Sequence, residues 1–222
     1  MSVNVVGGSS YLANFVAVPD EIYGSGQDGN VTISANTTLT RDMFYNNLII
    51  NDGVHLNTAG YRVFVRNNLS LGSGSGVQTT TSIGLKNGSS ATGTLAGGGT
   101  TSVTNSLGGA SASYTVTAPT PTGYFNLARN AVAGYMLHAG QTTALNLRGG
   151  AGDGTNPGGG VVVVTARTYS GYGTIYATGY NNGSANTTGG GVVVFVSQNA
   201  VGANLTLNVT GYASGTAKSF IV

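Results

Sequence analysis

The stretch "GGGVVVV" at residues 158–164 returns as "GGGVVVF" at residues 189–195. A run of consecutive valines is typical of a strand that is buried on both faces, because a half-exposed strand would alternate with polar residues. The preceding glycines let the chain turn onto the strand and let neighbouring backbones pack closely. The repeat therefore predicts two buried strands, at residues 161–164 and 192–195, in adjacent or next-adjacent turns of a repeating fold.

The amino-acid composition is that of an all-β chain with many turns. The 222 residues include 38 glycines, more than twice the usual share of about 7%. The glycines follow no Gly-X-Y period, which excludes collagen, and the many Val, Thr and Tyr residues favour strands. Disordered chains are usually rich in charge, whereas this chain has eight Lys plus Arg and six Asp plus Glu. Composition therefore predicts a folded β protein whose surface carries little charge.

Charge and cysteine content argue against several partners. The net charge is +2 and no two Lys or Arg are adjacent, so there is no basic patch for nucleic acid. The chain has no Cys, so nothing indicates an oxidising compartment. The first residues lack the regions of a signal peptide, and the longest aliphatic run is far shorter than the ~20 residues of a spanning helix. We expect a chain made in the cytoplasm, with no nucleic-acid partner and no membrane insertion.

Short strand-like segments recur at nearly constant spacing. In the second half they start at residues 145, 161, 174, 192 and 205, and in the first part they form two interleaved series, 31–33, 48–50 and 62–65, and 38–40, 54–56 and 69–71. Asn-rich turns separate them. This regularity favours a right-handed β-solenoid (β-helix) with stacked coils of about 13–18 residues and Asn ladders at the corners. The alternative is a β-sandwich or jelly roll.

Changes in composition divide the chain into four regions. Residues 1–26 form an N-terminal docking arm, 27–71 the first β-helical coils, 72–122 a Ser/Thr/Gly-rich excursion, and 123–222 a Gly-rich second β-helical part. Alternation within the excursion favours weak strands in a small subdomain, and a flexible linker is the alternative.

Residues 29–71, "GNVTISANTTLTRDMFYNNLIINDGVHLNTAGYRVFVRNNLSL", resemble a group of glycine-rich tailed-bacteriophage proteins. Members carry a similar segment, followed by Gly-rich loops and "GGGGVVVV"-type strands. The resemblance implies a β-helical virion component, either tail-fibre-like or head-decorating, and it brings no catalytic motif. The shorter, Ser/Thr-rich loops in the middle of this chain depart from that pattern.

The titratable residues give no strong catalytic or metal signature. Glycoside hydrolysis needs two carboxyl groups roughly 5 to 10 Å apart, and the few acids here are adjacent or sit in turns. Asp42 is expected to form a local ion pair with its neighbour Arg41. The alternative is that Asp42 and Asp52 approach each other across coils as the carboxylate pair of a hydrolase. Asp153, in "GGAGDG", belongs to neither a repeated motif nor the multi-carboxylate set of a Ca²⁺ site, and it is interpreted as a loop residue. We therefore expect no enzyme activity, no cofactor and no metal.

Histidine and tyrosine positions complete the candidates. His55 and His138 lie far apart without Cys partners and are interpreted as structural. Four tyrosines gather within twelve positions, as either a glycan-stacking surface or an interface set: Tyr169, Tyr172, Tyr176 and Tyr180.

The N-terminal region supplies a candidate anchor. Its apolar residues would be sticky in a free tail, so they are expected to dock onto a virion partner or to pack on the protein itself. The residues chosen for this role are Tyr11, Leu12, Phe15 and Val16.

Together these features predict a structural, surface-exposed component of a tailed-bacteriophage virion, serving as capsid decoration (cement) or as a fibre protein. The expected partners are further copies in a homotrimer and other virion proteins of the capsid or tail. The alternative is a receptor- or glycan-binding fibre tip that contacts a host-surface glycan, and a polysaccharide-degrading tailspike is less favoured.

Overall fold

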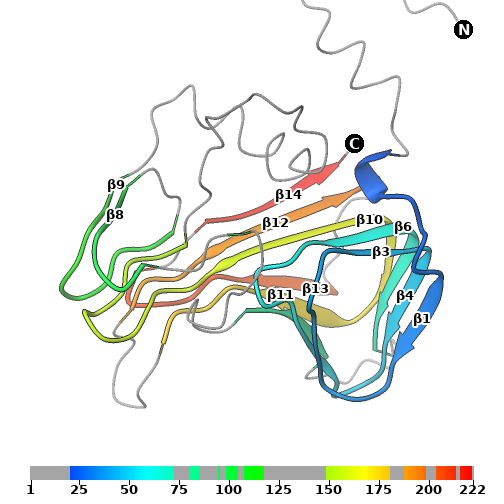
Figure 1. Ribbon diagram of the computed structural model, residues 1–222, viewed down its shortest axis with the longest axis horizontal. Helices are drawn as coiled ribbons and strands as arrows, with labels where there is room; N and C mark the ends of the chain where they lie inside the picture. Colours follow the sequence, from blue (N-terminus) through cyan, green and yellow to red (C-terminus); the bar gives the residue numbers. More distant parts are fainter. Residues whose placement is uncertain are drawn as a thin grey trace, which may run out of the picture.

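The computed structural model describes residues 21–72, 81–85, 95, 99–104, 108–117, 149–180, 188–198, 204–213 and 216–221. In these ranges the chain forms strands and one turn of 3-10 helix, η1 (Glu21–Tyr23), so the protein is all-β as composition predicts (Figure 1). No helix in this part of the chain is long and apolar enough to span a membrane. The strands are β1 (Asn30–Ile33), β2 (Thr37–Thr38), β3 (Met43–Tyr45), β4 (Asn47–Ile50), β5 (His55–Asn57), β6 (Val63–Leu71), β7 (Ser82–Gly84), β8 (Val103–Thr104), β9 (Val116–Thr117), β10 (Val161–Gly171), β11 (Gly173–Tyr176), β12 (Val192–Ser197), β13 (Leu205–Asn208) and β14 (Thr216–Ile221).

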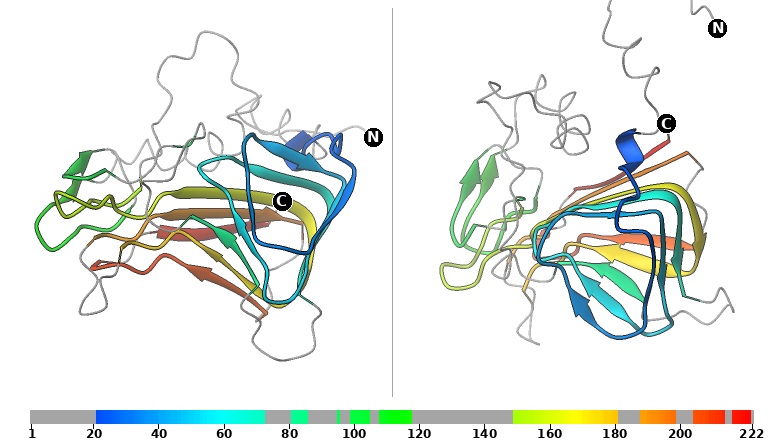
Figure 2. Two further views of the ribbon diagram at one scale, coloured as in Figure 1. Left: turned by 60° about the horizontal axis from the view of Figure 1, so that its bottom comes forward. Right: turned by 45° about the vertical axis from the view of Figure 1, so that its right-hand side comes forward.

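Most strands belong to two parallel sheets that pack against each other. Sheet A has the order β1-β4-β6-β10-β12-β14, with β3 also beside β6, and sheet B has the order β2-β5-β7-β11-β13. The chain passes back and forth between the sheets, so the strands of each sheet follow one another in sequence order (Figure 2). Parallel pairing throughout fits poorly with the β-sandwich or jelly-roll alternative, because those folds are built from antiparallel strands.

The two valine runs lie side by side in sheet A. Val161 pairs with Val192 and Val164 pairs with Phe195, parallel and in register. Every side chain in residues 161–164 and 192–195 is at most 1% exposed. The prediction of buried strands in adjacent or next-adjacent turns is therefore confirmed, and the two strands are direct neighbours.

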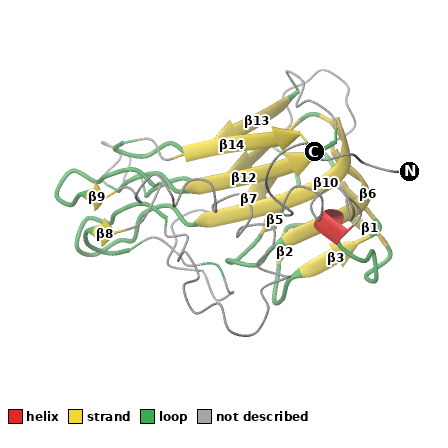
Figure 3. Ribbon diagram, turned by 90° about the horizontal axis from the view of Figure 1, so that it is seen from above, coloured by secondary structure: helices red, strands yellow, loops and turns green. Residues whose placement is uncertain are grey.

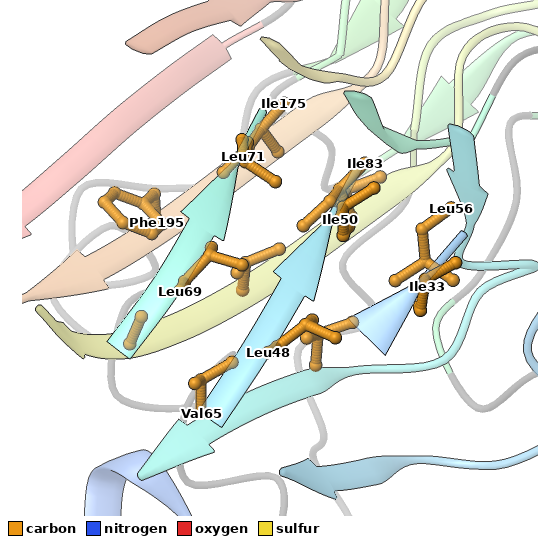
Figure 4. Packing of buried hydrophobic residues seen from close by; sticks show 14 of the residues in the cluster. Ile33, Leu48, Ile50, Leu56, Val65, Leu69, Leu71, Ile83, Ile175 and Phe195 are labelled. Atoms are coloured by element: carbon orange, nitrogen blue, oxygen red, sulfur yellow. The ribbon is translucent and has the colours of Figure 1, made fainter. Parts of the chain in front are cut away.

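Alternate residues of these runs enter two different apolar clusters. One set, which includes Val162 and Val193, belongs to the main core between the sheets, where leucines and isoleucines of both sheets meet (Figure 4). The other set, which includes Val161 and Val192, packs on the opposite face of sheet A with Ile22 of η1. Both faces are removed from water, which explains why the sequence there is continuously apolar.

Sheet A bends at a corner where β6 changes its partner on one side from β3 to β4. Residues 63–65 of β6 pair with β3, whereas residues 69–71 pair with β4. β10 follows the same path, and its register to β6 shifts between Ala166 and Thr168. The early turns of the chain therefore contribute two columns of stacked strands to sheet A and one column to sheet B. In sheet A, one column contains β3 and the first part of β6, and the other contains β1, β4 and the last part of β6.

Asparagines connect successive turns at this corner. Asn46 Nδ2 donates to Asn30 Oδ1 at 2.9 Å, and Asn67 Nδ2 donates to Asn46 Oδ1 at 2.8 Å. The backbone follows the same column, since Asn46 N–H donates to Gly29 O at 2.7 Å and Asn67 N–H donates to Asn46 O at 2.9 Å. An amide side chain both donates and accepts hydrogen bonds, so it can stack in this way. The expected Asn ladder is present here.

The repeating unit is longer than the spacing of strand starts indicates. Val192 lies beside Val161, and Leu205 lies beside Gly173, so one full turn leads from Val161 through β11 to Val192. The coil of about 13–18 residues expected from the sequence is therefore wrong for the second half of the chain. The distance from one strand start to the next leads only from one sheet to the other, so a full turn takes two such steps.

The two strand series expected over residues 31–71 are also partly misassigned. Residues 63–65 pair with β3 and not with residues 48–50, and residues 69–71 pair with β4 and not with β5. Periodicity alone does not distinguish strands that are neighbours in one sheet from strands that face each other across the core.

The glycines before β10 and β12 form a hydrogen-bonded bundle of backbone segments. This glycine bundle comprises residues 149–151, 158–160 and 189–191, together with Gly109. Gly150 N–H donates to Gly159 O and Gly159 N–H donates to Gly189 O, both at 2.8 Å. It lies at the end of the molecule that carries the small parallel sheet of β8 and β9, away from η1 (Figure 3). Within the region 72–122, β7 pairs inside sheet B, whereas β8 and β9 pair with each other.

Candidate functional site

The acidic side chains of the first turns hold ion pairs across turns. Arg41 contacts Asp28 twice, with Nη2 2.6 Å from Oδ1 and Nη1 3.1 Å from Oδ2. Arg62 contacts Asp42 Oδ2 with Nη2 at 2.6 Å and Nε at 2.9 Å. The expected local pair of Arg41 with Asp42 is therefore wrong. Each carboxylate also accepts a hydrogen bond from a backbone N–H in its cross-turn position. Asp28 accepts from Phe44 N–H at 2.7 Å, and Asp42 accepts from Arg62 N–H at 2.8 Å.

These contacts favour the charged form of Asp28. Its pKa is lowered chiefly because the Arg41 guanidinium hydrogen-bonds the carboxylate, and the Phe44 N–H acts in the same direction while burial opposes both. A glycosidase general acid needs the opposite shift. Asp28 is thus suited to holding two turns together and not to proton donation.

Asp153 closes a turn. Its Oδ1 accepts the N–H of Thr155 at 2.9 Å and of Asn156 at 2.7 Å, and its Oδ2 accepts Asn156 Nδ2 at 3.0 Å. This is the local bonding of an Asx-turn. The described part of the chain holds no group of three or more His, Asp or Glu side chains that could bind a metal ion.

A histidine and a tyrosine meet on the outer face of sheet B. His55 comes from β5, Ser82 from β7 and Tyr176 from β11. The Tyr176 hydroxyl lies 2.9 Å from His55 Nε2, and His55 Nδ1 lies 3.1 Å from Ser82 Oγ. The imidazole and phenol rings have centroids 5.3 Å apart and planes 23° apart. We call His55, Ser82 and Tyr176 the His–Tyr platform.

Strand alternation and a glycine place this platform. Ile83 and Ile175 point into the main core, so their neighbours Ser82 and Tyr176 belong to the opposite face of the sheet. Gly84 pairs with Tyr176, and a Cβ on Gly84 would lie 2.7 Å from Tyr176 Cγ. The Tyr176 ring therefore lies over Gly84, in space that the side chain of any other residue at position 84 would fill.

Both rings of the platform are neutral near neutral pH. Burial lowers the pKa of His55, and burial raises the pKa of Tyr176 to about 12. The Ser82–His55 contact resembles a nucleophile and its base, but an acyl-transfer site also needs N–H donors for an oxyanion. The Ser82 N–H is instead bonded to Val54 O at 3.1 Å. The platform therefore offers neutral hydrogen-bonding groups and ring faces for binding.

The four predicted tyrosines occupy different surroundings. Tyr169 packs on the main core, edge-on to Phe195 at 6.1 Å between centroids, and its hydroxyl donates to Asn204 O at 3.3 Å. Tyr172 lies between β10 and β11, and Tyr180 follows β11, where its N–H donates to Thr188 Oγ1 at 2.6 Å. Tyr176 is the member that belongs to the His–Tyr platform.

The described chain begins where it packs on sheet A. Ile22 and Tyr23 are 8% and 1% exposed, and Thr165 Oγ1 donates to Ile22 O at 2.9 Å. The Arg167 guanidinium lies 5.8 Å from the centre of the Tyr23 ring. The predicted docking residues, and the second histidine, lie outside the described residues: Tyr11, Leu12, Phe15, Val16 and His138.

The His–Tyr platform was not identifiable from the sequence. His55 and Tyr176 are 121 residues apart, and His55 was expected to be structural. Alternation marks both as outward-facing, but only the pairing of β5 with β7 and of β7 with β11 brings them together.

Comparisons with known proteins add no functional neighbour. No protein-family model, no curated protein and no solved structure matches this chain. The proposals below therefore rest on the geometry and on the resemblance of residues 29–71.

Proposed function

We propose that this protein is a right-handed β-solenoid that serves as a structural, surface-exposed component of a tailed-bacteriophage virion, as capsid decoration or as a fibre protein. The solenoid is supported by the alternation between two parallel sheets, each with its strands in sequence order. The right hand is supported by the strong preference of parallel crossover connections for that hand.

The observation that carries the structural role is the in-register stack of β10 and β12. Its side chains are buried on both faces of sheet A, and the corner beside it is connected from turn to turn by side-chain and backbone hydrogen bonds. Such a stack removes these side chains from water and holds successive turns of the chain in one register. The segment that resembles virion proteins contains β1 to β6, so the resemblance falls on the turns that begin this stack.

The proposal includes no catalytic activity. Asp28 and Asp42 are each held by an arginine and a backbone N–H. A glycosidase needs one carboxyl group free to protonate the leaving group and a second free to act as base or nucleophile. Carboxylates held in this way support a structural function.

Attachment to the virion is assigned to the apolar residues before η1. Ile22 and Tyr23 fix the start of the described chain on sheet A, which leaves Tyr11, Leu12, Phe15 and Val16 as the anchor that docks onto a capsid or tail protein. Apolar arms and strand addition are common docking modes.

Deletion of residues 1–20 tests this proposal, because it removes the anchor and keeps Ile22 and Tyr23. The full chain should decorate particles that lack the protein, and the truncated chain should fold but fail to bind. The matched control is full-length Tyr23→Ala, which should melt at a lower temperature and still bind. Binding by the truncated chain would rule out the arm as anchor, and failure of the full chain to bind heads or tails would rule out the virion function.

A further inference from the structure

We infer that the outer face of sheet B is a binding site for an uncharged saccharide, with Tyr176 as the ring on which a sugar stacks. This goes beyond the structural role and does not depend on it, since the surface exists on the isolated chain.

The outer face of sheet B presents hydrogen-bonding side chains in two rows. The core row between them consists of Leu56, Ile83, Ile175 and Leu207. Strand alternation places the residues on either side of this row on the opposite face. The first row is His55, Ser82, Thr174 and Thr206, and the second is Thr38, Asn57, Gly84, Tyr176 and Asn208.

These side chains are accessible and uncharged. Thr38 and Thr206 are exposed, and the other side chains of the two rows are partly exposed. Gly84 has no side chain and is buried beneath the Tyr176 ring. Hydroxyls, amides and a neutral imidazole donate and accept hydrogen bonds without selecting for charge. A charged ligand would find no counter-charge in either row, so the complementary ligand is polar and neutral.

The Tyr176 ring supplies the apolar part of the surface. It lies over Gly84 and its hydroxyl reaches His55, which fixes the ring orientation before any ligand binds. A pyranose has C–H groups on its ring faces and hydroxyls around its rim. An aromatic face beside hydroxyl and amide groups matches both features, because Tyr combines an apolar body with a polar tip.

Fixing the ring in advance also reduces the cost of binding. Ordering a mobile side chain opposes association, and here the hydrogen bond to His55 and the contact with Gly84 have already ordered it. The rows continue on both sides of Tyr176 across β5, β7, β11 and β13, so the surface suits an oligosaccharide better than a single sugar.

The test is direct binding of the purified full chain to neutral oligosaccharides, measured by saturation-transfer NMR and calorimetry. The panel is maltohexaose, cellohexaose, mannohexaose and the hexamer of N-acetylglucosamine, with heparin as the charged comparison. We expect at least one neutral oligosaccharide to bind and heparin not to bind. Tyr176→Ala should weaken that binding about tenfold or more, the loss of roughly 1.4 kcal/mol that one stacking contact supplies.

Two further variants separate the ring from other effects. Tyr176→Phe keeps the ring and its contact with Gly84 but loses the hydrogen bond to His55, so it should lose less binding than Tyr176→Ala. Tyr212→Ala removes a tyrosine that is 59% exposed elsewhere and should bind like the unchanged protein. All variants should melt cooperatively, because Tyr176 and Tyr212 lie outside the main core.

The inference is overturned if no neutral oligosaccharide of the panel binds, if heparin binds more tightly, or if Tyr176→Ala binds as well as Tyr212→Ala. None of these results bears on attachment to the virion, which the deletion of residues 1–20 tests separately.

Discussion

At the scale of single residues, glycine and valine have complementary roles in the repeated stretch. Glycine lets backbones approach: a Cβ on Gly159 would lie 2.4 Å from Gly191 N and 2.7 Å from Ala177 O. Valine then fills the space on both faces of the strand that follows, with a branched side chain that suits a pleated strand. The change from one residue type to the other coincides with the change from glycine bundle to sheet.

Replacing Gly159 by Ala tests how closely the bundle is packed. The added methyl would meet fixed backbone atoms and not flexible side-chain ends, so we expect a loss of about 1–3 kcal/mol of stability in chemical denaturation. The control is Gly29→Asn, because nothing lies within 4 Å of a Cβ on Gly29 and Asn tolerates its positive φ. Equal effects of the two changes would contradict the close packing.

Replacing Val193 by Asp tests the buried stack. Val193 is fully buried in the main core, so an unpaired carboxylate there should destabilise the fold by several kcal/mol, on the order of 3–5. Ile49→Asp is the matched control, since Ile49 lies in the same sheet but is 44% exposed and should change stability by about 0.5 kcal/mol. If Val193→Asp melts like the unchanged protein, the stacked arrangement is wrong.

At the scale of elements, the early turns are joined by charges as well as by strand pairing. The Asp28–Arg41 ion pair connects the loop before β1 to the loop before β3. The Asp42–Arg62 ion pair connects the loop before β3 to the residue that precedes β6. Both pairs span a whole turn of the chain. They therefore help to fix which strand lies beside which, a choice that apolar pairing alone leaves open.

The Asp28–Arg41 pair should give a pH-dependent contribution. Because the pKa of folded Asp28 is lowered from 3.8, its stabilising effect is present above the unfolded pKa and is lost as pH falls through the folded pKa. Arg41→Gln should therefore melt at a lower temperature than the unchanged protein at pH 7. That difference should shrink as the pH is lowered from 4 toward 2, and a difference that is constant over this range would contradict the assignment.

At the scale of the whole molecule, both sheets end in edge strands. Within the described residues, β1 and β14 lie at the two ends of the sheet A path, and β2 and β13 at those of sheet B. Unpaired strand edges favour association with other chains, and a chain with so few charges has little electrostatic repulsion to oppose it. Self-association is the expected consequence.

The homotrimer expected for a fibre or decoration protein is a prediction at this scale. Multi-angle light scattering of the purified full chain at micromolar concentration should give three times the chain mass of 22.1 kDa. The truncated chain lacking residues 1–20 is the control, and it should remain a trimer if strand edges, and not the arm, hold the copies together. A monodisperse monomer of the full chain would disprove the trimer.

Sequence alone determined the local features of this protein. The uninterrupted valines predicted strands buried on both faces, because only such strands tolerate apolar side chains at every position. The repeat of "GGGVVV" at 158 and 189 predicted that these strands lie in adjacent or next-adjacent turns, and the recurring asparagines predicted the ladder at the corner. These predictions depend on side-chain type and spacing, which the sequence states directly.

Only the tertiary structure decided what depends on contacts between distant residues. It showed that a full turn in the second half leads from Val161 to Val192 by way of both sheets, that residues 69–71 pair with β4, and that Arg41 pairs with Asp28. It also brought together His55 and Tyr176, which come from different turns. A strand has the same local pattern whichever strand lies beside it, so the sequence did not specify these partners, and packing and hydrogen bonding in the folded chain selected them.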